Sequence, residues 1–396
     1  MSSSTRTVIV AGARTPTGKF RGAFSNLQAV ELGARAIRAA VERAGIAGEQ
    51  VDYTIMGHVL QAGAGQITSL QASIGGGLPK DVPAITVNKV CLSGMSAIAM
   101  ADQVIRAGEI EVAVAGGMES MTNAPYVLPK GREGTRLGDA ELIDSMIHDG
   151  LWSSFLDQHM GEGTDEVSAE LGLSREEQDA WAARSHQRAH AAWEGGHMTE
   201  EVVPVEAPQR RGSPVTVDRD EGIRPDTTPE KLAGLPPAFR ADGTITAGNA
   251  SQISDGACAV VVMSAERAHE LGVTPLAEIV AYGMSSDRYP SLHTVPAMAL
   301  ERALKRSGLA ASDLGLVEIN EAFAAVPIHS ARLLGVDDAI VNVNGGAVAL
   351  GHPIGASGAR IVLTLLTEMR RRDVELGGAA ICGGGGQGDA LVLRRG

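Results

Sequence analysis

Residues 84–108, AITVNKVCLSGMSAIAMADQVIRAG, place a cysteine at the junction of two sequence patterns. The run before Cys91 is rich in β-branched residues and predicts a buried strand, whereas the small residues after it predict a helix. A thiol at the start of a helix lies near unpaired backbone N–H groups and the positive end of the helix dipole, which favour the thiolate. Cys91 is therefore a candidate nucleophile, although a buried cysteine is more often an inert core residue.

The composition describes a large folded protein. Its 396 residues are 44% hydrophobic, which is enough for about two or three domains with sizeable cores. No apolar run approaches the roughly 20 residues of a membrane helix, and the N-terminus leads straight into a strand without the apolar region of a signal peptide. We therefore expect a cytoplasmic protein that does not insert into membranes.

The cysteine count and the net charge exclude further classes. Three widely spaced cysteines cannot form a disulfide framework, and no metal-binding spacing of cysteines or histidines is present, so we expect reduced thiols and no metal site. The net charge of −13 gives no general attraction to nucleic acid or to an anionic membrane. A ligand that carries phosphate must therefore meet a local group of basic residues.

The order of patterns repeats in the two halves of the chain. Strand and helix patterns alternate from residue 7 onward, which indicates an α/β fold. The stretch GARAIRAAVERAGIAGEQVDY at 33–53 is similar to MALERALKRSGLAASDLGLVE at 298–318. Each half then continues into a Val-Asn strand, at 87 and at 341, followed by a long helix and a glycine-rich strand end. An internal duplication is the simplest account of this repeat.

Two of the predicted helices correspond to each other across this repeat. The helix after Cys91 and its counterpart at 355–369 are apolar around most of their circumference, which predicts that both are buried on all sides. Two such helices can pack against each other between two sheets. Their N-termini then meet near one point, and Cys91 lies at that point.

A segment of different composition, residues 122–250, separates the two halves. It holds most of the charged and Pro/Gly-rich sequence, and Ser174 with Glu177 predicts a capping box before an amphipathic helix. The strand and helix patterns that follow look like the delayed completion of the first half. We therefore expect a first core half at 1–121 plus 251–275, a loop domain at 122–250 and a second core half at 276–396.

Four motifs resemble those of the thiolases, in the same order: VNKVCLSGMSA at 87–97, NEAFAA at 320–325, NVNGGAVALGHPIGASGAR at 342–360 and CGGGGQG at 382–388. The resemblance extends along nearly the whole chain. It implies a duplicated α/β fold with five layers, αβαβα, and an inserted loop domain that binds coenzyme A. It also implies an acyltransferase that condenses two acetyl-CoA molecules to acetoacetyl-CoA and coenzyme A by a reversible Claisen reaction.

The resemblance implies catalytic roles for five residues. Cys91 would carry the acetyl group, because a thiolate both attacks a thioester and leaves it readily. His352 would take up the Cys91 proton and later help to hold an oxyanion. Cys382 would deprotonate the methyl group of the second acetyl-CoA. The backbone N–H groups of Cys91 and Gly384 would form one oxyanion hole, and Asn320, through a water molecule, would form the other with His352.

Five further residues would contact coenzyme A by the same resemblance. Arg224 would face the adenine end and Ser251 the pantetheine, while the channel would be lined by His159, Met160 and Leu151. Coenzyme A and its acyl thioesters are then substrates, and no covalently bound cofactor is expected.

Thiolases are commonly dimers or tetramers, so the resemblance also implies a homo-oligomer. A homotetramer is our specific expectation. The basic, glycine-rich stretch PKGREGTRLGD at 129–139 is a candidate assembly loop.

One turn departs from the family pattern. Many thiolases carry Met-Gly-x-Gly-Pro beside the acyl pocket, where this chain has Leu292, His293 and Val295. The added side chain of Val295 would either narrow the pocket or reshape the loop, and we expect a short acyl group. Three functions stay open: a short-chain thiolase first, a 3-ketoacyl-CoA thiolase of broader chain length in fatty-acid β-oxidation second, and a non-catalytic acyl-CoA- or lipid-binding relative third.

Overall fold

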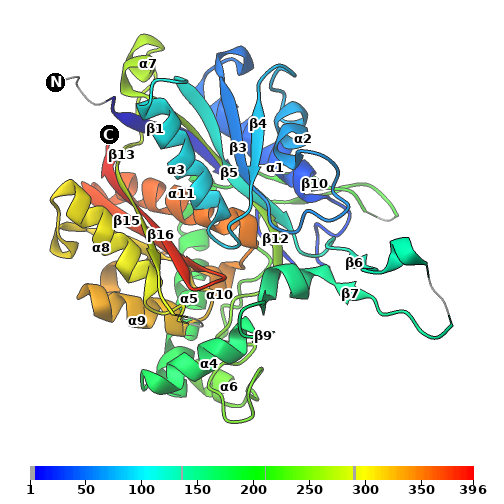
Figure 1. The fold of residues 1–396 in the computed structure, drawn as a ribbon. Coiled ribbons are helices and arrows are strands. Elements are labelled where there is room, and N and C mark those ends of the chain that lie inside the picture. Colours follow the sequence, from blue (N-terminus) through cyan, green and yellow to red (C-terminus); the bar gives the residue numbers. More distant parts are fainter. Residues whose placement is uncertain (1–4, 135–136, 210, 289–290) are drawn as a thin grey trace.

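The computed structural model describes residues 5–134, 137–209, 211–288 and 291–396 (Figure 1). Strands and helices alternate in the first half, and one strand and one helix of this half follow the insertion. These elements are β1 (Thr7–Arg14), β2 (Gly18–Lys19), α1 (Ala29–Ala44), β3 (Tyr53–Gly57), α2 (Thr68–Gly75), β4 (Ala84–Val87), α3 (Ser93–Arg106), β5 (Val112–Ser120), β12 (Ser254–Ser264) and α7 (Ala265–Glu270).

The second half has the same alternation. Its elements are β13 (Ala277–Ser286), α8 (Val295–Ser307), β14 (Leu316–Ile319), α9 (Ala325–Leu334), α10 (Ala347–Leu350), α11 (Ile354–Arg372), β15 (Leu376–Gly383) and β16 (Gln387–Arg395). Short 3₁₀ turns lie at Gly48–Gln50, Gly131–Glu133, His197–Glu200, Ala311–Asp313 and Asp338–Ile340, and a π-helical turn at Met146–Leu151. α8 ends at Gly308, which caps it in the left-handed conformation.

The order of paired strands repeats from one half to the other. It is β1-β12-β5-β3-β4 in the first half and β13-β16-β15-β14 in the second. In both halves the first three strands pair antiparallel and the later pairs are parallel. β1 pairs with β13 at Val8 and Ile9, which joins the half-sheets into one sheet of ten strands. The predicted duplication is confirmed.

The helices form three layers around the two half-sheets. α1 packs on one face of the first half-sheet, and α8 packs on strands of the second. α3 and α11 pack against each other, and each contacts strands of both halves, so these two helices form the middle layer. The layer order is therefore αβαβα, as the resemblance implied.

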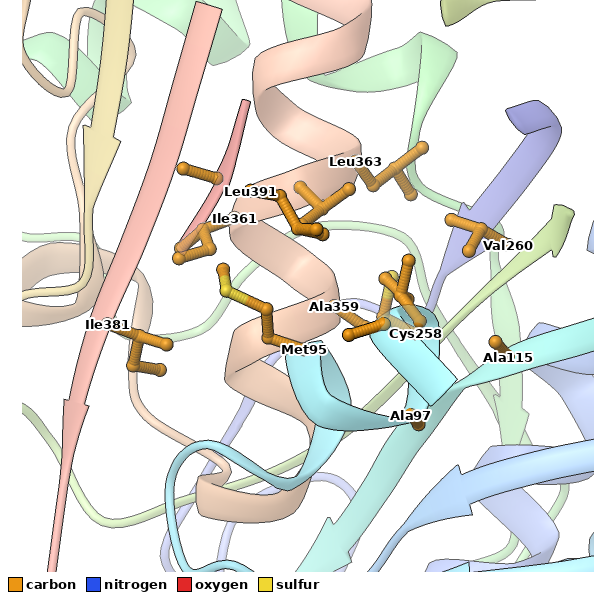
Figure 2. Packing of buried hydrophobic residues seen from close by; sticks show 14 of the residues in the cluster. Met95, Ala97, Ala115, Cys258, Val260, Ala359, Ile361, Leu363, Ile381 and Leu391 are labelled. Carbon is orange, nitrogen blue, oxygen red and sulfur yellow. The ribbon is translucent and has the colours of Figure 1, made fainter. Parts of the chain in front are cut away.

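Side chains along β12 pack alternately on the two faces of the first half-sheet. Val260 and Val262 join the central cluster with the middle helices, whereas Val261 and Met263 join the cluster around α1. This is the period of two that a strand buried on both faces requires. Figure 2 shows the central cluster, in which Cys258 is a core residue.

The middle helices are buried as predicted. Residues 93–99 of α3 and 354–366 of α11 are all buried. Only the later turns of each helix reach solvent. The helical starts, which lie next to the catalytic motifs, are therefore shielded from water.

The Val-Asn strand expected at 341 is reduced to one bridge. Within the described range 291–396, Val341 pairs only with Val317, whereas β4 pairs with β3 along its length. The cause is Asn342, which is left-handed with φ of 48°. Its side-chain amide accepts the N–H of Ile319 and donates to the carbonyl of Ile319, each at 2.8 Å. The side chain thus makes the hydrogen bonds that a strand backbone would make.

The described residues of the insertion form short strands and three helices: β6 (Tyr126–Val127), β7 (Ile143–Asp144), β8 (Trp152–Ser153), β9 (Gln158–His159), α4 (Met160–Glu170), α5 (Arg175–Glu194), β10 (Val205–Ala207), β11 (Val215–Val217) and α6 (Pro229–Ala233). The capping box before α5 is confirmed, because Ser174 Oγ accepts the N–H of Glu177 at 3.1 Å. β6 and β7 form the base of an arm that projects from the body (Figure 1).

A buried arginine attaches the insertion to the core. Arg14 at the end of β1 donates to Asp220 at 2.7 Å and to Glu201 at 2.6 Å. All three side chains are buried, so each charge depends on the others.

The boundaries that we expect for the two core halves and the loop domain stay a prediction. None of the helices in the described ranges has both the length and the apolar character that a membrane-spanning segment needs.

Candidate active site

The loop between β4 and α3 presents Cys91. α3 begins at Ser93, two residues later. Ser93 fixes the loop, because its Oγ accepts the N–H of Lys89 at 2.9 Å and donates to the carbonyl of Val90 at 2.6 Å. Val90 is left-handed, with φ of 50°, a conformation that costs about 1–3 kcal/mol. The loop is therefore held in a strained, defined conformation directly before the nucleophile.

Burial dominates the chemistry of the Cys91 thiol. It raises the pKa of Cys91 to about 12, and the negative charge of Glu119 acts in the same direction. The backbone N–H groups of Cys91 and Gly384 hydrogen-bond to the sulfur and lower this pKa by less. The expectation that the helix start favours the thiolate is wrong here, because the loss of water outweighs the backbone donors. The thiol keeps its proton at neutral pH and needs a base.

Cys382 approaches Cys91 from the end of β15. Its side chain is buried, and both burial and the nearness of Cys91 raise the pKa of the Cys382 thiol. The glycine turn that follows fits directly against the Cys91 loop, since a Cβ on Gly383 would lie 2.7 Å from Leu92 Cγ. The structure thus brings the two thiols within electrostatic reach of each other.

His352 and Asn320 form the second part of the site. His352 Nε2 lies 3.5 Å from Asn320 Nδ2, and His352 Nδ1 lies 2.6 Å from Ser357 Oγ. Ser357 donates to the carbonyl of Pro353 at 2.9 Å, so Nδ1 carries the ring proton and Nε2 keeps a free electron pair. Burial, together with the charge of Arg360, lowers the pKa of His352 to about 3. His352 is therefore a neutral base that presents Nε2 toward Asn320.

The amide of Asn320 is held in one orientation. Its Oδ1 accepts a hydrogen bond from Arg360 at 3.3 Å, which leaves the NH₂ group for His352. Its backbone N–H donates to the carbonyl of Ala380 at 3.0 Å, two residues before Cys382. Asn320 thus connects the histidine to the strand that carries the second cysteine.

The two parts of the site meet where α3 and α11 begin. A Cβ on Gly94 would lie 2.9 Å from the carbonyl oxygen of Gly355, and one on Gly358 would lie 2.5 Å from the backbone nitrogen of Met95. Only glycine permits so close an approach. The prediction that the two helix starts meet at one point is therefore confirmed. In the part of the chain that the structure describes, neither ring nitrogen of His352 hydrogen-bonds to a cysteine.

A cavity of about 560 Å³ opens beside the Cys91 loop. Its lining combines that loop with the glycine turn and the start of α4: Val59, Asn88, Lys89, Val90, His148, Asp149, Gly150, Trp152, Ser153, Ser154, Phe155, Met160, Gly384, Gly385 and Gln387. A smaller cavity adjoins it, and Ser153, Met160 and Gly385 line both. The expected contact residue Met160 thus reaches the main cavity, and His159 reaches the smaller one.

The other expected coenzyme A contacts are dispersed. Leu151 is half-buried and packs against the cluster that contains Cys91. Ser251 donates its N–H to the carbonyl of Ala322 at 3.0 Å, beside Asn320. Arg224 is exposed and is not among the described residues that line the main cavity.

The turn that departs from the family pattern lies next to the smaller cavity. Leu292 is buried and lines this cavity. Val295 is fully buried in the outer core around α8, so it is Leu292, and not Val295 as expected, that limits the space here. His293 is fully buried. Its Nε2 lies 3.0 Å from Ser168 Oγ, and its backbone carbonyl accepts the hydroxyl of Ser330 at 2.6 Å.

Sequence reasoning missed two buried carboxylates near the cysteines. Asp389 in β16 accepts hydrogen bonds from Lys89 at 2.7 Å and from Ser96 at 2.6 Å. Glu119 in β5 accepts three backbone N–H groups. A signal was present in the sequence, since Glu119 ends a run of apolar and small residues in β5, and Asp389 stands directly before the apolar run 390–393 of β16. Such a charge costs several kcal/mol unless it is paired.

Known proteins match this chain along nearly its whole length. Residues 7–266 match the family described as "Thiolase, N-terminal domain" and residues 273–395 match "Thiolase, C-terminal domain". A "Probable acetyl-CoA acetyltransferase" from Mycolicibacterium smegmatis is 56% identical over 98% of this chain and 100% of its own length. A protein of the same name from Mycobacterium tuberculosis is 55% identical over 99% and 100%. An "Acetyl-CoA acetyltransferase" from Pseudomonas aeruginosa is 52% identical over 98% and 99%.

Proposed function

The chain belongs to the thiolase family, and we propose that it is an acetyl-CoA acetyltransferase that condenses two acetyl-CoA molecules to acetoacetyl-CoA and coenzyme A, or catalyses the reverse reaction. Relatives of that name cover almost the entire chain at 52% to 56% identity. The observation that carries the proposal is the meeting of two buried thiols beside a cavity that Val90 and Gly384 line, with the N–H of Gly384 at the sulfur of Cys91.

In the acylation step, Cys91 attacks the thioester carbonyl of acetyl-CoA. Nε2 of His352 takes the thiol proton and returns it to the departing coenzyme A sulfur, which leaves acetyl-Cys91. Because the pKa of Cys91 lies far above that of His352, proton transfer and attack occur together. The N–H groups of Cys91 and Gly384 stabilise the tetrahedral oxyanion, each by about 3 kcal/mol.

In the condensation step, Cys382 first passes its thiol proton to Nε2 of His352, and the resulting thiolate removes a proton from the methyl group of the second acetyl-CoA. The enolate oxygen is held by His352 and, through a water molecule, by Asn320. Nε2 of His352 donates the proton it received from Cys382, while Nδ1 keeps its own proton toward Ser357. The enolate carbon attacks the carbonyl of acetyl-Cys91, and the sulfur of Cys91 leaves with the proton from Nε2 of His352 as acetoacetyl-CoA forms.

Coenzyme A binding is assigned to the five contacts derived from the resemblance. Met160, His159 and Leu151 would form the wall near the thiols, Ser251 would contact the pantetheine, and Arg224 would meet the adenine end. The exposed guanidinium of Arg224 is the kind of basic group that an acidic protein needs for a phosphate ligand.

Short acyl chains should be strongly preferred. The smaller cavity is about 10 Å³, room for about one water molecule, and Leu292 is part of its lining. We expect kcat/KM for thiolysis to fall at least roughly tenfold for 3-ketoacyl-CoA substrates longer than acetoacetyl-CoA, because each added methylene must displace packed side chains. Rates on a series of increasing length check this.

Leu292→Ala should restore part of the activity on the longer substrates. Leu333→Ala, which alters an exposed leucine of α9, is the matched control and should change nothing. A flat length profile in the unaltered protein would favour the 3-ketoacyl-CoA thiolase instead.

A dimer or tetramer is part of the proposal. β4 is an edge strand of the sheet, and its Ile85 is 37% exposed. Such an edge is a template for pairing with a second copy. Leu137 and Leu142 on the projecting arm are also exposed; residues 135 and 136 of the expected assembly loop lie outside the described residues.

Ile85→Lys should dissociate the assembly to single chains of 41.0 kDa. Leu137→Ser with Leu142→Ser should reduce a tetramer to a dimer and leave a dimer unchanged. Light scattering after size exclusion measures both. A monomeric unaltered protein would contradict this part of the proposal.

The substrates also suggest where the protein acts. Acetyl-CoA and acetoacetyl-CoA are water-soluble thioesters, and we place the protein in the cytoplasm. The reaction joins or releases two-carbon units, which is a step of fatty-acid metabolism. Coenzyme A serves as substrate in this role, with no covalently bound cofactor.

A further inference from the structure

Glu119 is a fully buried carboxylate that the proposed reaction does not use. Its Oε2 accepts the backbone N–H of Val59 at 3.1 Å and of Gly355 at 2.9 Å, and its Oε1 accepts the N–H of Leu60 at 3.1 Å. Nε2 of His58 lies 3.4 Å from Oε1. Backbone N–H groups therefore donate to both carboxylate oxygens of Glu119.

The three hydrogen bonds join the two halves of the molecule at the catalytic centre. Val59 and Leu60 follow β3 of the first half, whereas Gly355 is the second residue of α11 in the second half. The first N–H groups of a helix have no partner within it, and the helix dipole favours a carboxylate there. Glu119 thus caps α11 from 236 positions away in the sequence.

The contact between Glu119 and α11 leaves little room for adjustment. A Cβ on Gly355 would lie only 2.8 Å from Glu119 Oε2, so glycine is required there. His352 stands three residues before Gly355. A shift of the carboxylate therefore moves the start of the helix on which His352 depends.

Glu119 also acts on the nucleophile. Its negative charge raises the pKa of the Cys91 thiol. Burial raises the pKa of Glu119 itself to about 7. The three backbone N–H groups lower this pKa, and the charge of Asp255 raises it further. The facing imidazole of His58 supplies no positive charge near neutral pH, because burial lowers the pKa of His58 to about 4.

We propose that Glu119 is a positioning residue that fixes His352 relative to Cys91 by locking the start of α11 onto the end of β3. This inference rests on the proposed function for the role of His352. The link between Glu119 and Cys91 is independent of it, since it concerns the reactivity of the thiol alone.

Two variants separate the charge of Glu119 from its geometry. Glu119→Gln keeps the shape but turns an NH₂ group toward at least one N–H donor, and it removes the charge. The kcat for acetoacetyl-CoA thiolysis should fall at least roughly tenfold with little change in KM, while alkylation of Cys91 by iodoacetamide at about pH 8 should become roughly three- to tenfold faster.

The gain in alkylation should vanish at about pH 6, where Glu119 of the unaltered protein is protonated as well. Glu119→Asp keeps the charge but is one methylene too short to reach both halves. It should lose kcat to a similar extent without faster alkylation. Glu368→Gln is the matched control, because Glu368 is a buried carboxylate near the far end of the same helix, and both readouts should stay unchanged.

Three results would overturn the proposal. These are wild-type kcat in Glu119→Gln, a fall in kcat without any change in alkylation, and failure of both variants to fold, which would assign Glu119 to stability alone. Thiolysis by the unaltered protein is the internal reference. Its absence would contradict the proposed function, while the alkylation arm would still test the link from Glu119 to Cys91.

Discussion

Replacing Cys91 with alanine should abolish acetoacetyl-CoA thiolysis while the fold stays intact. The variant has no sulfur to form the acyl bond, so the rate should fall at least about a thousandfold, as it does when other covalent nucleophiles are removed. Loss of one small buried group should cost only about 1 kcal/mol of stability. Steady-state thiolysis and the thermal unfolding midpoint measure the two effects separately.

Cys258→Ala provides the matched control for this prediction. Cys258 is as buried as Cys91 but lies in β12 within the central cluster. The control should lose a similar amount of stability and keep its activity. Retention of more than a few per cent of activity in Cys91→Ala would exclude the covalent mechanism.

The Cys382→Ser variant should accept an acetyl group on Cys91 but fail to condense it. A serine hydroxyl is a far weaker base than a thiolate, so we expect condensation to fall at least roughly a hundredfold. Acylation uses Cys91, His352 and the N–H of Gly384, and should stay within about threefold of the unaltered protein. A burst of about one coenzyme A per chain, without acetoacetyl-CoA, is the expected result.

A second substitution tests whether the introduced serine hydroxyl itself affects the result. Cys382→Ala should behave in the same way, because the base role belongs to the sulfur and not to its volume. Condensation at the unaltered rate in either variant would disprove the base role. Loss of acylation in both would show that Cys382 supports the Cys91 site instead.

Most of the fold could be predicted from the sequence because the two halves carry the same pattern. The amphipathic α1 and α8 stand in matching positions, as do α3 and α11, which are apolar around most of their circumference, and β12 reads as a buried strand. The sequence could not show that the strand expected at Val341 is reduced to one bridge. Its loss depends on the amide of Asn342, which replaces backbone pairing with Ile319, and a Val-Asn pair alone does not reveal that geometry.

The main site residues were recognisable from the motifs that the chain shares with the thiolases, and Cys91 also from its place between a predicted strand and a predicted helix. The structure brings Cys91, His352, Asn320 and Cys382 to adjoining positions. The pKa of Cys91 was predicted in the wrong direction, since the helix start is a local feature whereas burial is produced by distant parts of the chain. Glu119 was missed for the same reason, because its three partners lie 59, 60 and 236 positions away.

The position of the acetyl group tests the central claim most directly. The protein, unaltered and as Cys382→Ser, is mixed with acetyl-CoA, quenched in acid and digested, and the acetylated peptides are identified by mass spectrometry. We predict about one acetyl group per chain of Cys382→Ser, carried by the peptide that contains Cys91. An acetyl group on Cys382 or Cys258, or turnover of acetyl-CoA without any acetylated cysteine, would contradict the account.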